Sequence, residues 1–436
     1  MYLPIRFYYA AIAVIVVLGL GQLWPPLFWV GAALLVLLAL LLIVDIALLW
    51  TRRGITAERQ CDSRFSNGDD NPVTIKVDNG YPFATRLNII DEIPHVFQRR
   101  DINYTMRLAA GESGTVDYTL RPTKRGVYNF GHIRAFVSSP LGLVQRRFTC
   151  GEPADVAVYP SYLMLNRYEF LAISNNLNEM GIKRIRRVGN NTEFEQIKSY
   201  VQGDDYRLIN WKASARTHQL MVNVYTDERA QPIINVIDKG RIMQQAFDGM
   251  TILDYAINAA LVLSYVALHR DDKAGIITFA EKLGDFVKPD RSPTQMNDIL
   301  ECLYHQTTRF AESDYSALVA GVNRLVGRRS LLVLYTNFFD YTSFLRQLPY
   351  LQQLNKRHRL LVVFFIDEER RQFINDRPHS VKDYYEQSIA EKIDQEQNLI
   401  INTLRQQGIN SLLTTPQGLS VNVINRYLEM KSRGLL

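Results

Sequence analysis

Residues 189–216 bring together acids, bases and aromatic side chains at a spacing that fits neither a helix nor a strand. Polar side chains gathered without a regular period usually mark a site or an interface. The carboxylates of Glu193, Asp204 and Asp205 have the chemistry of general acids and bases. The guanidinium of Arg207 or Arg216 can form a bidentate ion pair with Asp204 or Glu193. This signature segment therefore predicts either acid–base chemistry or a network of ion pairs.

Nucleophilic catalysis has weaker support in the signature segment. Ser214 has no His nearby except His218, and the chain contains no Gly-x-Ser-x-Gly elbow. Two interpretations stay open: an enzyme of unknown reaction that uses Glu193, Asp204 and Arg207, or a structural brace in which Trp211 covers an ion pair. Neither interpretation selects a substrate.

A second set of polar residues follows apolar runs in the C-terminal half. The apolar runs are 233–237, 274–279, 331–336, 360–366 and 411–414. Helical patterns separate them at 254–269, 292–305, 313–326, 342–355, 381–407 and 419–431. This alternation predicts a doubly wound parallel sheet of five strands, buried on both faces. The carboxyl ends of the strands then carry Asp238, Phe279, Asn337 and Asp367, where such folds place their sites.

The elements of the signature segment resemble those of the bacterial domain-of-unknown-function 58 family. They are Gly189, Glu193, Phe194, Tyr200, Gly203, Asp204, Asp205, Arg207, Trp211, Ser214, Ala215 and Arg216. The chain departs from the family pattern at Lys198, usually Arg, and at Asn210, often Asp. The resemblance implies association with a MoxR-type AAA+ ATPase, and an adaptor role in complex assembly or envelope maintenance.

The C-terminal part also resembles the von Willebrand factor type A fold. In that fold an Asp-x-Ser-x-Ser motif helps to hold Mg²⁺ through oxygen ligands. Here the motif reads Asp238-Lys239-Gly240-Arg241-Ile242, and Thr336-Asn337 stands at the later Asp position. Both hydroxyls are lost and two cations are gained, so we expect no metal and no other cofactor. Lys239 or Arg241 is instead expected to meet an acidic partner directly, although Asp238 has an alternative interpretation as a helix N-cap.

The N-terminal part carries two apolar runs, residues 7–23 and 27–49, each about long enough to cross a bilayer. Only residues 22–26 separate them, which predicts a transmembrane helical hairpin rather than a cleaved signal peptide. Arg6, Arg52 and Arg53 flank the runs, whereas the turn has no charge, so both termini are expected to be cytoplasmic. Three widely spaced cysteines fit a reducing compartment. Asp45, inside the second run, receives no role.

Between these parts, residues 55–160 show short alternating runs split by turn residues, which predicts a small antiparallel β-sandwich. Near its end, Ser139-Pro-Leu-Gly-Leu143 resembles a Pro-aromatic-or-Leu-Gly-Leu turn of the same family, and structurally it requires only a tight turn. The basic run 183–187 contributes to a net charge of +6 and fits a solvated linker or a contact with anionic lipid. Nucleic-acid binding is not expected, because no aromatic platform or reading helix accompanies the run. The chain also lacks a phosphate loop for nucleotide hydrolysis.

Together these patterns predict four regions: a transmembrane hairpin at 1–53, a β-sandwich at 55–160, the signature and linker at 161–231 packed on the α/β domain, and a von Willebrand factor type A-like α/β domain at 232–436. The expected protein is a two-pass adaptor of a bacterial inner membrane, with the bulk of the chain cytoplasmic. Its docking edge consists of Asp238, Lys239, Arg241 and Asn337. The two alternatives are the enzyme described above and a structural envelope protein without an ATPase partner.

Overall fold

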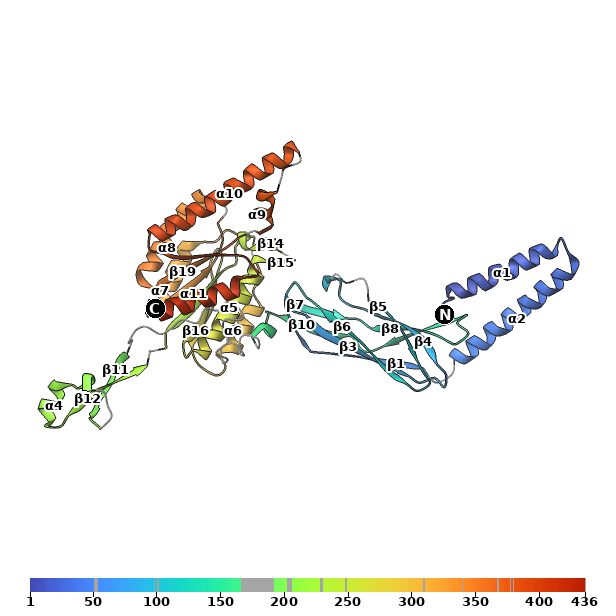
Figure 1. Cartoon of the computed structure of the whole chain (residues 1–436), viewed down its shortest axis with the longest axis horizontal. Coiled ribbons are helices and arrows are strands. Elements are labelled where there is room, and N and C mark those ends of the chain that lie inside the picture. Colours follow the sequence, from blue (N-terminus) through green and yellow to red (C-terminus); the bar gives the residue numbers. More distant parts are fainter. Residues whose placement is uncertain are drawn as a thin grey trace. The chain divides into compact units, whose positions relative to one another are not determined.

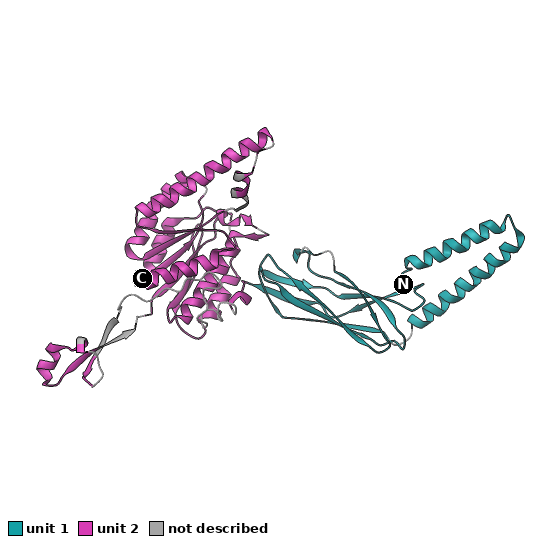
Figure 2. Cartoon of the chain, viewed as in Figure 1, with its two compact units in different colours: residues 1–159 teal, residues 160–436 magenta. Residues whose placement is uncertain are grey.

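The computed structural model describes the chain except for residues 51–53, 98, 100–101, 166–191, 202–205, 228–229, 248, 309, 339, 367, 377, 379 and 436. The chain forms two compact units, Met1–Tyr159 and Pro160–Leu436 (Figure 2). The four predicted regions subdivide these units further and stay predictions. Cys61, Cys150 and Cys302 are free thiols.

Two apolar helices open the first unit. Helix α1 spans Ile5–Gly21 and helix α2 spans Pro25–Leu49 (Figure 1). The two helices pack closely, since a Cβ on Gly31 would lie 2.7 Å from the side chain of Leu18. Helix α2 has the length and the apolar composition of a membrane span, whereas α1, with 17 residues, lies at the lower limit.

The rest of the first unit is a set of β-sheets. The strands are β1 (Ile55–Cys61), β2 (Arg64–Ser66), β3 (Asn71–Asn79), β4 (Thr85–Asp91), β5 (Asn103–Leu108), β6 (Ser113–Leu120), β7 (Gly126–Phe130), β8 (Ile133–Ser138), β9 (Gln145–Cys150) and β10 (Ala154–Tyr159), with a short helix η1 (His95–Phe97). Their orders are β1-β3-β6, β2-β10-β7 and β5-β4-β8-β9. Alternating buried and exposed residues, clearest in β3 and β6, turn one face of each strand inward. The apolar core includes Val73, Leu87, Phe130 and Ile133.

The second unit contains a six-stranded mixed sheet in the order β17-β16-β13-β18-β19-β20. The strands are β13 (Pro232–Asp238), β16 (Lys273–Phe279), β17 (Leu283–Asp290), β18 (Leu331–Tyr335), β19 (Arg359–Phe365) and β20 (Asn410–Thr414). The prediction of a purely parallel, five-stranded sheet is wrong in one respect, because β17 is an antiparallel edge strand. Its pattern is half exposed, so it lacks the continuous apolar run that marks a strand buried on both faces.

Helices cover both faces of the mixed sheet. They are α5 (Ile252–His269), α6 (Gln295–Tyr304), α7 (Tyr315–Leu325), α8 (Tyr341–Arg357), α9 (Glu368–Asn375), α10 (Val381–Gln406) and α11 (Leu419–Ser432). One core combines Ile233 and Ile237 of β13 with residues of α5, α6 and α11, and the opposite core combines Ile234 and Val236 with residues of α7, α8 and α10. The apolar helix α5 is 72% buried in its most apolar window, so it is a core helix of this unit.

Short elements complete the second unit. They are η3 (Tyr206–Leu208), α4 (Trp211–Thr217), η4 (Arg241–Gln244), β14 (Ala246–Phe247) and β15 (Met250–Thr251). Strands β11 (Thr192–Ser199) and β12 (Met221–Asp227) form a separate antiparallel two-stranded sheet. Most of the predicted signature segment therefore lies on this β-hairpin and in the connection between its strands.

Candidate functional site

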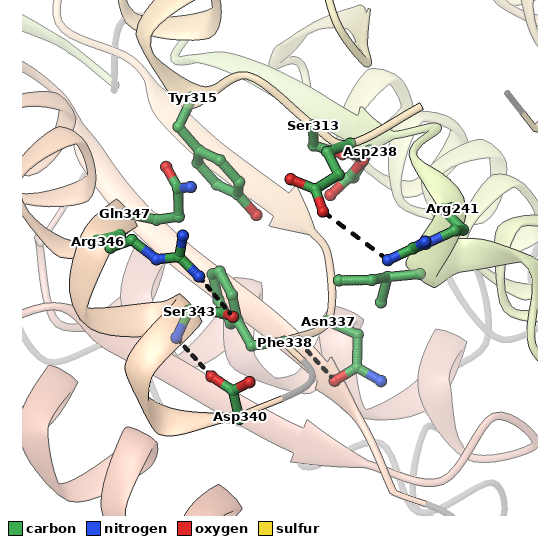
Figure 3. A pocket seen from close by; sticks show the side chains of 12 residues that line it. Asp238, Arg241, Ser313, Tyr315, Asn337, Phe338, Asp340, Ser343, Arg346 and Gln347 are labelled. Atoms are coloured by element: carbon green, nitrogen blue, oxygen red, sulfur yellow. Dashed lines mark hydrogen bonds and ion pairs between the residues drawn. The ribbon is translucent and has the colours of Figure 1, made fainter. Parts of the chain in front are cut away.

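A pocket of about 320 Å³ lies at the carboxyl ends of β13 and β18. Asp238 ends β13, Arg241 opens η4, Ser313 precedes α7, Asn337 follows β18 and Arg346 lies on α8. Figure 3 shows Arg241 and Arg346 on opposite sides of the pocket, with Asp238 and Asn337 between them. The parallel order of the strands brings these segments to one sheet edge, as expected for a wound α/β fold.

The carboxylate of Asp238 is buried and receives three hydrogen bonds. The Gly240 N–H donates to Oδ1 at 2.8 Å, and the Ser313 hydroxyl donates to the same oxygen. The Thr336 hydroxyl donates to Oδ2 at 2.7 Å and is itself 2.7 Å from the Tyr315 hydroxyl. Asp238 is therefore a structural centre that ties the ends of β13 and β18 to the segment before α7. The interpretation as a helix N-cap is wrong, because Gly240 holds the N-cap position of η4.

Burial dominates the ionisation of this centre. It raises the pKa of the Asp238 carboxyl above its ordinary value, although the bonds from Ser313, Gly240 and Thr336 act in the opposite direction. Burial and the neighbouring Asp238 also raise the pKa of the Tyr315 hydroxyl well above its ordinary range. Both groups therefore favour their neutral forms more than exposed groups would.

The geometry around Gly240 does not fit the metal site of the von Willebrand factor type A fold. A Cβ on Gly240 would lie 2.0 Å from Oγ of Ser313 and 3.1 Å from Oδ1 of Asp238. The space that the motif's first serine would need is thus filled by the hydroxyl of Ser313. Ile242 replaces the second serine, and the side-chain oxygen of Asn337 accepts the N–H of Phe338 at 3.1 Å. The hydroxyl oxygens that the motif supplies to Mg²⁺ are thus missing at positions 240 and 242, and the absence of a metal stays an expectation.

We expect Gly240→Ser to destabilise the second unit by about 1–3 kcal/mol, since the new side chain overpacks the space beside Ser313. Adding Ser313→Ala removes the clashing hydroxyl, and the hydroxyl introduced at position 240 can take over its hydrogen bond to Asp238, so most of this loss should be recovered. Chemical denaturation of the two variants and of Ser313→Ala alone measures both effects. Equal stability of wild type and Gly240→Ser would contradict the packing argument.

The structure separates the two cations of the predicted docking edge. Lys239 is only 9% exposed, and its ammonium group donates to Oε1 of Gln306 at 2.9 Å. Gln306 in turn donates to Asp285 at 2.7 Å. Arg241, in contrast, has a side chain 57% exposed and lines the pocket, 3.8 Å from the carboxylate of Glu312. Of these two cations, only Arg241 is placed to meet a partner.

Helix α8 contributes the other wall of the pocket. The Asp340 carboxylate caps the helix by accepting the Ser343 N–H at 2.5 Å, and this bond lowers the pKa of Asp340. One turn later, Arg346 donates to the Ser343 hydroxyl at 3.4 Å. Sequence reasoning missed Arg346, Ser313 and Tyr315 as pocket residues. The available signal was their position at or near the starts of two predicted helices, which face the carboxyl ends of the strands.

The described residues of the signature segment do not form a buried brace around the indole. Trp211, the first residue of α4, is 70% exposed. Ser214 is buried, where it donates to the Asn210 carbonyl at 2.8 Å and accepts the Met221 N–H at 2.9 Å. Arg216 is exposed, and Tyr200 pairs through its backbone N–H with the Leu220 carbonyl. Ser214 therefore has a local structural role in joining α4 to β12.

The candidate enzyme residues receive only a backbone position or none. Glu193 and Phe194 lie on β11, and Arg207 lies on η3. Gly189, Gly203 and Asp204 fall outside the described residues, as do the basic run 183–187 and Asp367. The enzyme hypothesis at Glu193, Asp204 and Arg207 stays a prediction.

The family model described as "Protein of unknown function DUF58" matches residues 196–407. These residues belong to the DUF58 family. The matched range includes most of the β11–β12 hairpin and the complete pocket around Asp238. It confirms the resemblance inferred from the signature segment.

The uncharacterized protein YeaD of Bacillus subtilis (strain 168) is 25% identical over 209 residues, which cover 46% of this chain and 51% of YeaD. The chain thus spans about half the length of this curated relative. Among solved structures, BatB from Bacteroides thetaiotaomicron is 10% identical with a TM-score of 0.31, covering 47% of this chain and 100% of that one. The CARDB domain of the PF1109 protein from Pyrococcus furiosus is 18% identical with a TM-score of 0.19, covering 24% and 93%. Because both TM-scores lie below 0.5, neither likeness establishes a fold.

Proposed function

We propose that this DUF58 protein is a membrane-anchored adaptor that docks a partner at the pocket beside Asp238. The observation that carries the proposal is that the pocket's carboxylate and its arginines differ in their partners. The buried carboxylate of Asp238 is occupied by three internal donors, whereas the guanidiniums of Arg241 and Arg346 line the opening. Guanidinium groups bind carboxylates through two parallel hydrogen bonds. The pocket therefore suits an acidic side chain of a partner without a bridging metal ion.

The contact between Arg241 and Glu312 supports this docking mode. The two groups are 3.8 Å apart, and the Glu312 side chain is 89% exposed. Such a loose surface pair contributes about 0–1 kcal/mol, so a partner carboxylate with better geometry can replace it. In the unbound protein Glu312 therefore lies beside Arg241 at the pocket without fixing it there. The exchange requires no covalent step and no titration of Asp238.

The fold of the second unit is proposed to be of the von Willebrand factor type A kind. Its central strand β13 lies between β16 and β18, with an antiparallel edge strand β17 and helices on both faces. The partner class follows from the DUF58 resemblance: a MoxR-type AAA+ ATPase or its client protein. Helices α1 and α2 are proposed to form a two-pass hairpin that anchors the chain in a bacterial inner membrane with both termini in the cytoplasm.

Charge reversal of Arg241 tests the docking site. Arg241→Glu should reduce recovery of the partner from cross-linked native membranes by at least about tenfold, because it removes an attraction and adds a repulsion. Arg433→Glu is the matched control, since Arg433 is 66% exposed and also pairs with a glutamate, Glu429. Both variants are first checked for folding by circular dichroism.

The pattern of recovery separates the proposal from its alternatives. Recovery of an AAA+ ATPase with wild type and Arg433→Glu, but not with Arg241→Glu, supports adaptor docking at the pocket. Equal recovery with all three chains would show that the partner docks elsewhere. If wild type recovers no ATPase, the partner inferred from the resemblance is wrong and the enzyme and envelope alternatives gain weight.

A further inference from the structure

Two features without an assigned role, Asp45 and the turn at 139–143, contact each other. Asp45 lies near the end of α2 and is fully buried. The Ser139 hydroxyl donates to Oδ1, and the backbone N–H groups of Leu143 and Val144 each donate to Oδ2 at 2.8 Å. The turn therefore binds a carboxylate, and that carboxylate comes from the apolar helix.

Internal hydrogen bonds also shape the turn that contacts Asp45. The Ser139 oxygen accepts the N–H groups of Leu141 at 3.1 Å and Gly142 at 3.2 Å. Gly142 has φ = 67°, a left-handed conformation in which glycine carries no steric cost. With these bonds made, the N–H groups of Leu143 and Val144 turn toward the helix. The turn that contains the Pro-Leu-Gly-Leu sequence thus supplies the hydrogen-bond donors for the Asp45 carboxylate.

Further bonds hold the same end of the sandwich to both helices. The Leu49 carbonyl, at the last residue of α2, accepts the Tyr81 hydroxyl at 2.8 Å and Arg146 at 2.5 Å. Before α1, Tyr2 and Gln145 exchange two backbone hydrogen bonds of 2.9 and 2.8 Å. The helix pair and this end of the sandwich are therefore joined at three places. If the helices cross a membrane, this end lies at the level of the lipid headgroups.

The same end of the sheet β5-β4-β8-β9 presents exposed arginines. Arg107 pairs across the sheet with Arg86, which pairs with Ser138, and Ser138 pairs with Gln145. Two residues further along each strand, on the same face, the next row contains Thr105, Asn88, Phe136 and Arg147. These eight described residues include three arginines, all exposed, and no acid. Arg6, in the first turn of α1, is exposed as well.

Glu112 is an acidic residue in the turn between β5 and β6. Glu112 is exposed, but its carboxylate accepts the Ala109 N–H at 2.6 Å and so has a local capping role. The two rows that contain Arg86, Arg107 and Arg147 are here termed the arginine face. No acidic side chain among the described residues of these rows balances the three positive charges. Guanidinium groups form bidentate bonds with phosphate, and cations near an anionic leaflet are attracted to it.

We propose that the arginine face binds the phosphate groups of anionic lipids in the membrane that holds α1 and α2. The proposal rests on the membrane anchoring stated above but not on the ATPase partner. The Asp45 contact sets the height and the orientation of the sandwich, and Arg86, Arg107 and Arg147 then meet the headgroups. The sandwich consequently contacts the membrane surface in a fixed orientation instead of being joined to the helices by a flexible linker.

Lipid photo-cross-linking of the full chain in nanodiscs tests this proposal. The discs contain phosphatidylcholine with a small fraction of photoreactive-headgroup phosphatidylglycerol or of matching photoreactive phosphatidylcholine. Adducts on the peptides that contain the arginine face are quantified by mass spectrometry. Phosphatidylglycerol should give several-fold more adduct, and this preference should fall with each arginine neutralised to glutamine. The triple variant Arg86→Gln/Arg107→Gln/Arg147→Gln should therefore lose it.

Two further variants make the result specific. Arg121→Gln/Lys124→Gln removes exposed charges after the opposite end of β6 and should leave the preference unchanged. Asp45→Asn keeps the arginines but weakens the turn contact, so it should lower the adduct yield without changing the charge of the arginine face. Equal adducts from both lipids, or an unchanged preference in the triple variant, would overturn the proposal. Release of the wild-type chain from native membranes by alkaline extraction would instead refute the anchoring itself.

Discussion

Replacing Asp238 by alanine is expected to lower the free energy of unfolding of the second unit by about 3–5 kcal/mol. The substitution leaves the Gly240 N–H and the hydroxyls of Ser313 and Thr336 without their acceptor in a buried setting. Asp238→Asn should cost about 1 kcal/mol, because the amide oxygen still accepts and the Thr336 hydroxyl can rotate to accept from the amide. Denaturant titration followed by circular dichroism measures both effects. A loss under 1 kcal/mol in Asp238→Ala would contradict the structural role.

The same carboxyl predicts a pH dependence with a definite sign. Burial raises the pKa of Asp238 in the folded protein above the ordinary value of 3.8. The folded state then binds the proton more tightly than the unfolded chain, so the contribution of Asp238 to stability is largest below pH 3.8 and is lost as pH rises through the folded pKa. The stability of wild type relative to Asp238→Asn should accordingly decrease over this range and then level off. A relative stability that increases with pH would show that the hydrogen bonds outweigh burial.

Substitution of Asp45 by alanine is expected to detach α2 from the turn at 139–144. Three donors lose their acceptor in a buried setting, which costs about 1–3 kcal/mol for each unsatisfied group, although the losses are not additive. We therefore expect a total loss of about 2–5 kcal/mol for this contact. Hydrogen exchange of the peptide containing Leu143 and Val144 should become at least about tenfold faster in the full-length protein in nanodiscs.

The isosteric variant Asp45→Asn separates the effect of losing one acceptor oxygen from the effect of losing the side chain's shape. Asp45→Asn retains one acceptor oxygen, so its exchange rates should lie between those of wild type and Asp45→Ala. Ser139→Ala removes one donor and should resemble Asp45→Asn more than Asp45→Ala. If both Asp45 variants exchange at the wild-type rate, the turn is closed by its own internal bonds and does not depend on the helix.

The predicted docking edge illustrates which parts of a candidate site a sequence can predict. The apolar runs at 233–237 and 331–336 placed Asp238 and Asn337 correctly at neighbouring strand ends, because side-chain periodicity reports local burial. The same reasoning treated Lys239 and Arg241 as equivalent surface cations. Lys239 instead turns inward to Gln306, 67 residues later in the chain. No local pattern contains that partner, so only the folded structure separates the two cations.

For the metal-binding motif as well, the sequence and the tertiary structure supply different parts of the explanation. The sequence alone showed that both serines of the motif are replaced. Tertiary packing explains why glycine stands at position 240: Ser313, far along the chain from Gly240, fills the space that the first serine would need. A hydroxyl recruited from another segment leaves no signal in the Asp238–Ile242 motif itself.

Sequence by itself determined the elements whose signal is local: two apolar helices near the N-terminus, the alternating strands within residues 55–160, the apolar strands of the mixed sheet and the DUF58 signature. Only tertiary structure decided the contacts between distant segments: Asp45 with the turn at 139–144, Arg86 beside Arg107, and Ser313 with Asp238. The physical reason is that periodicity and turn chemistry act between neighbours in the chain, whereas hydrogen-bond partners of buried polar groups are selected by the completed fold.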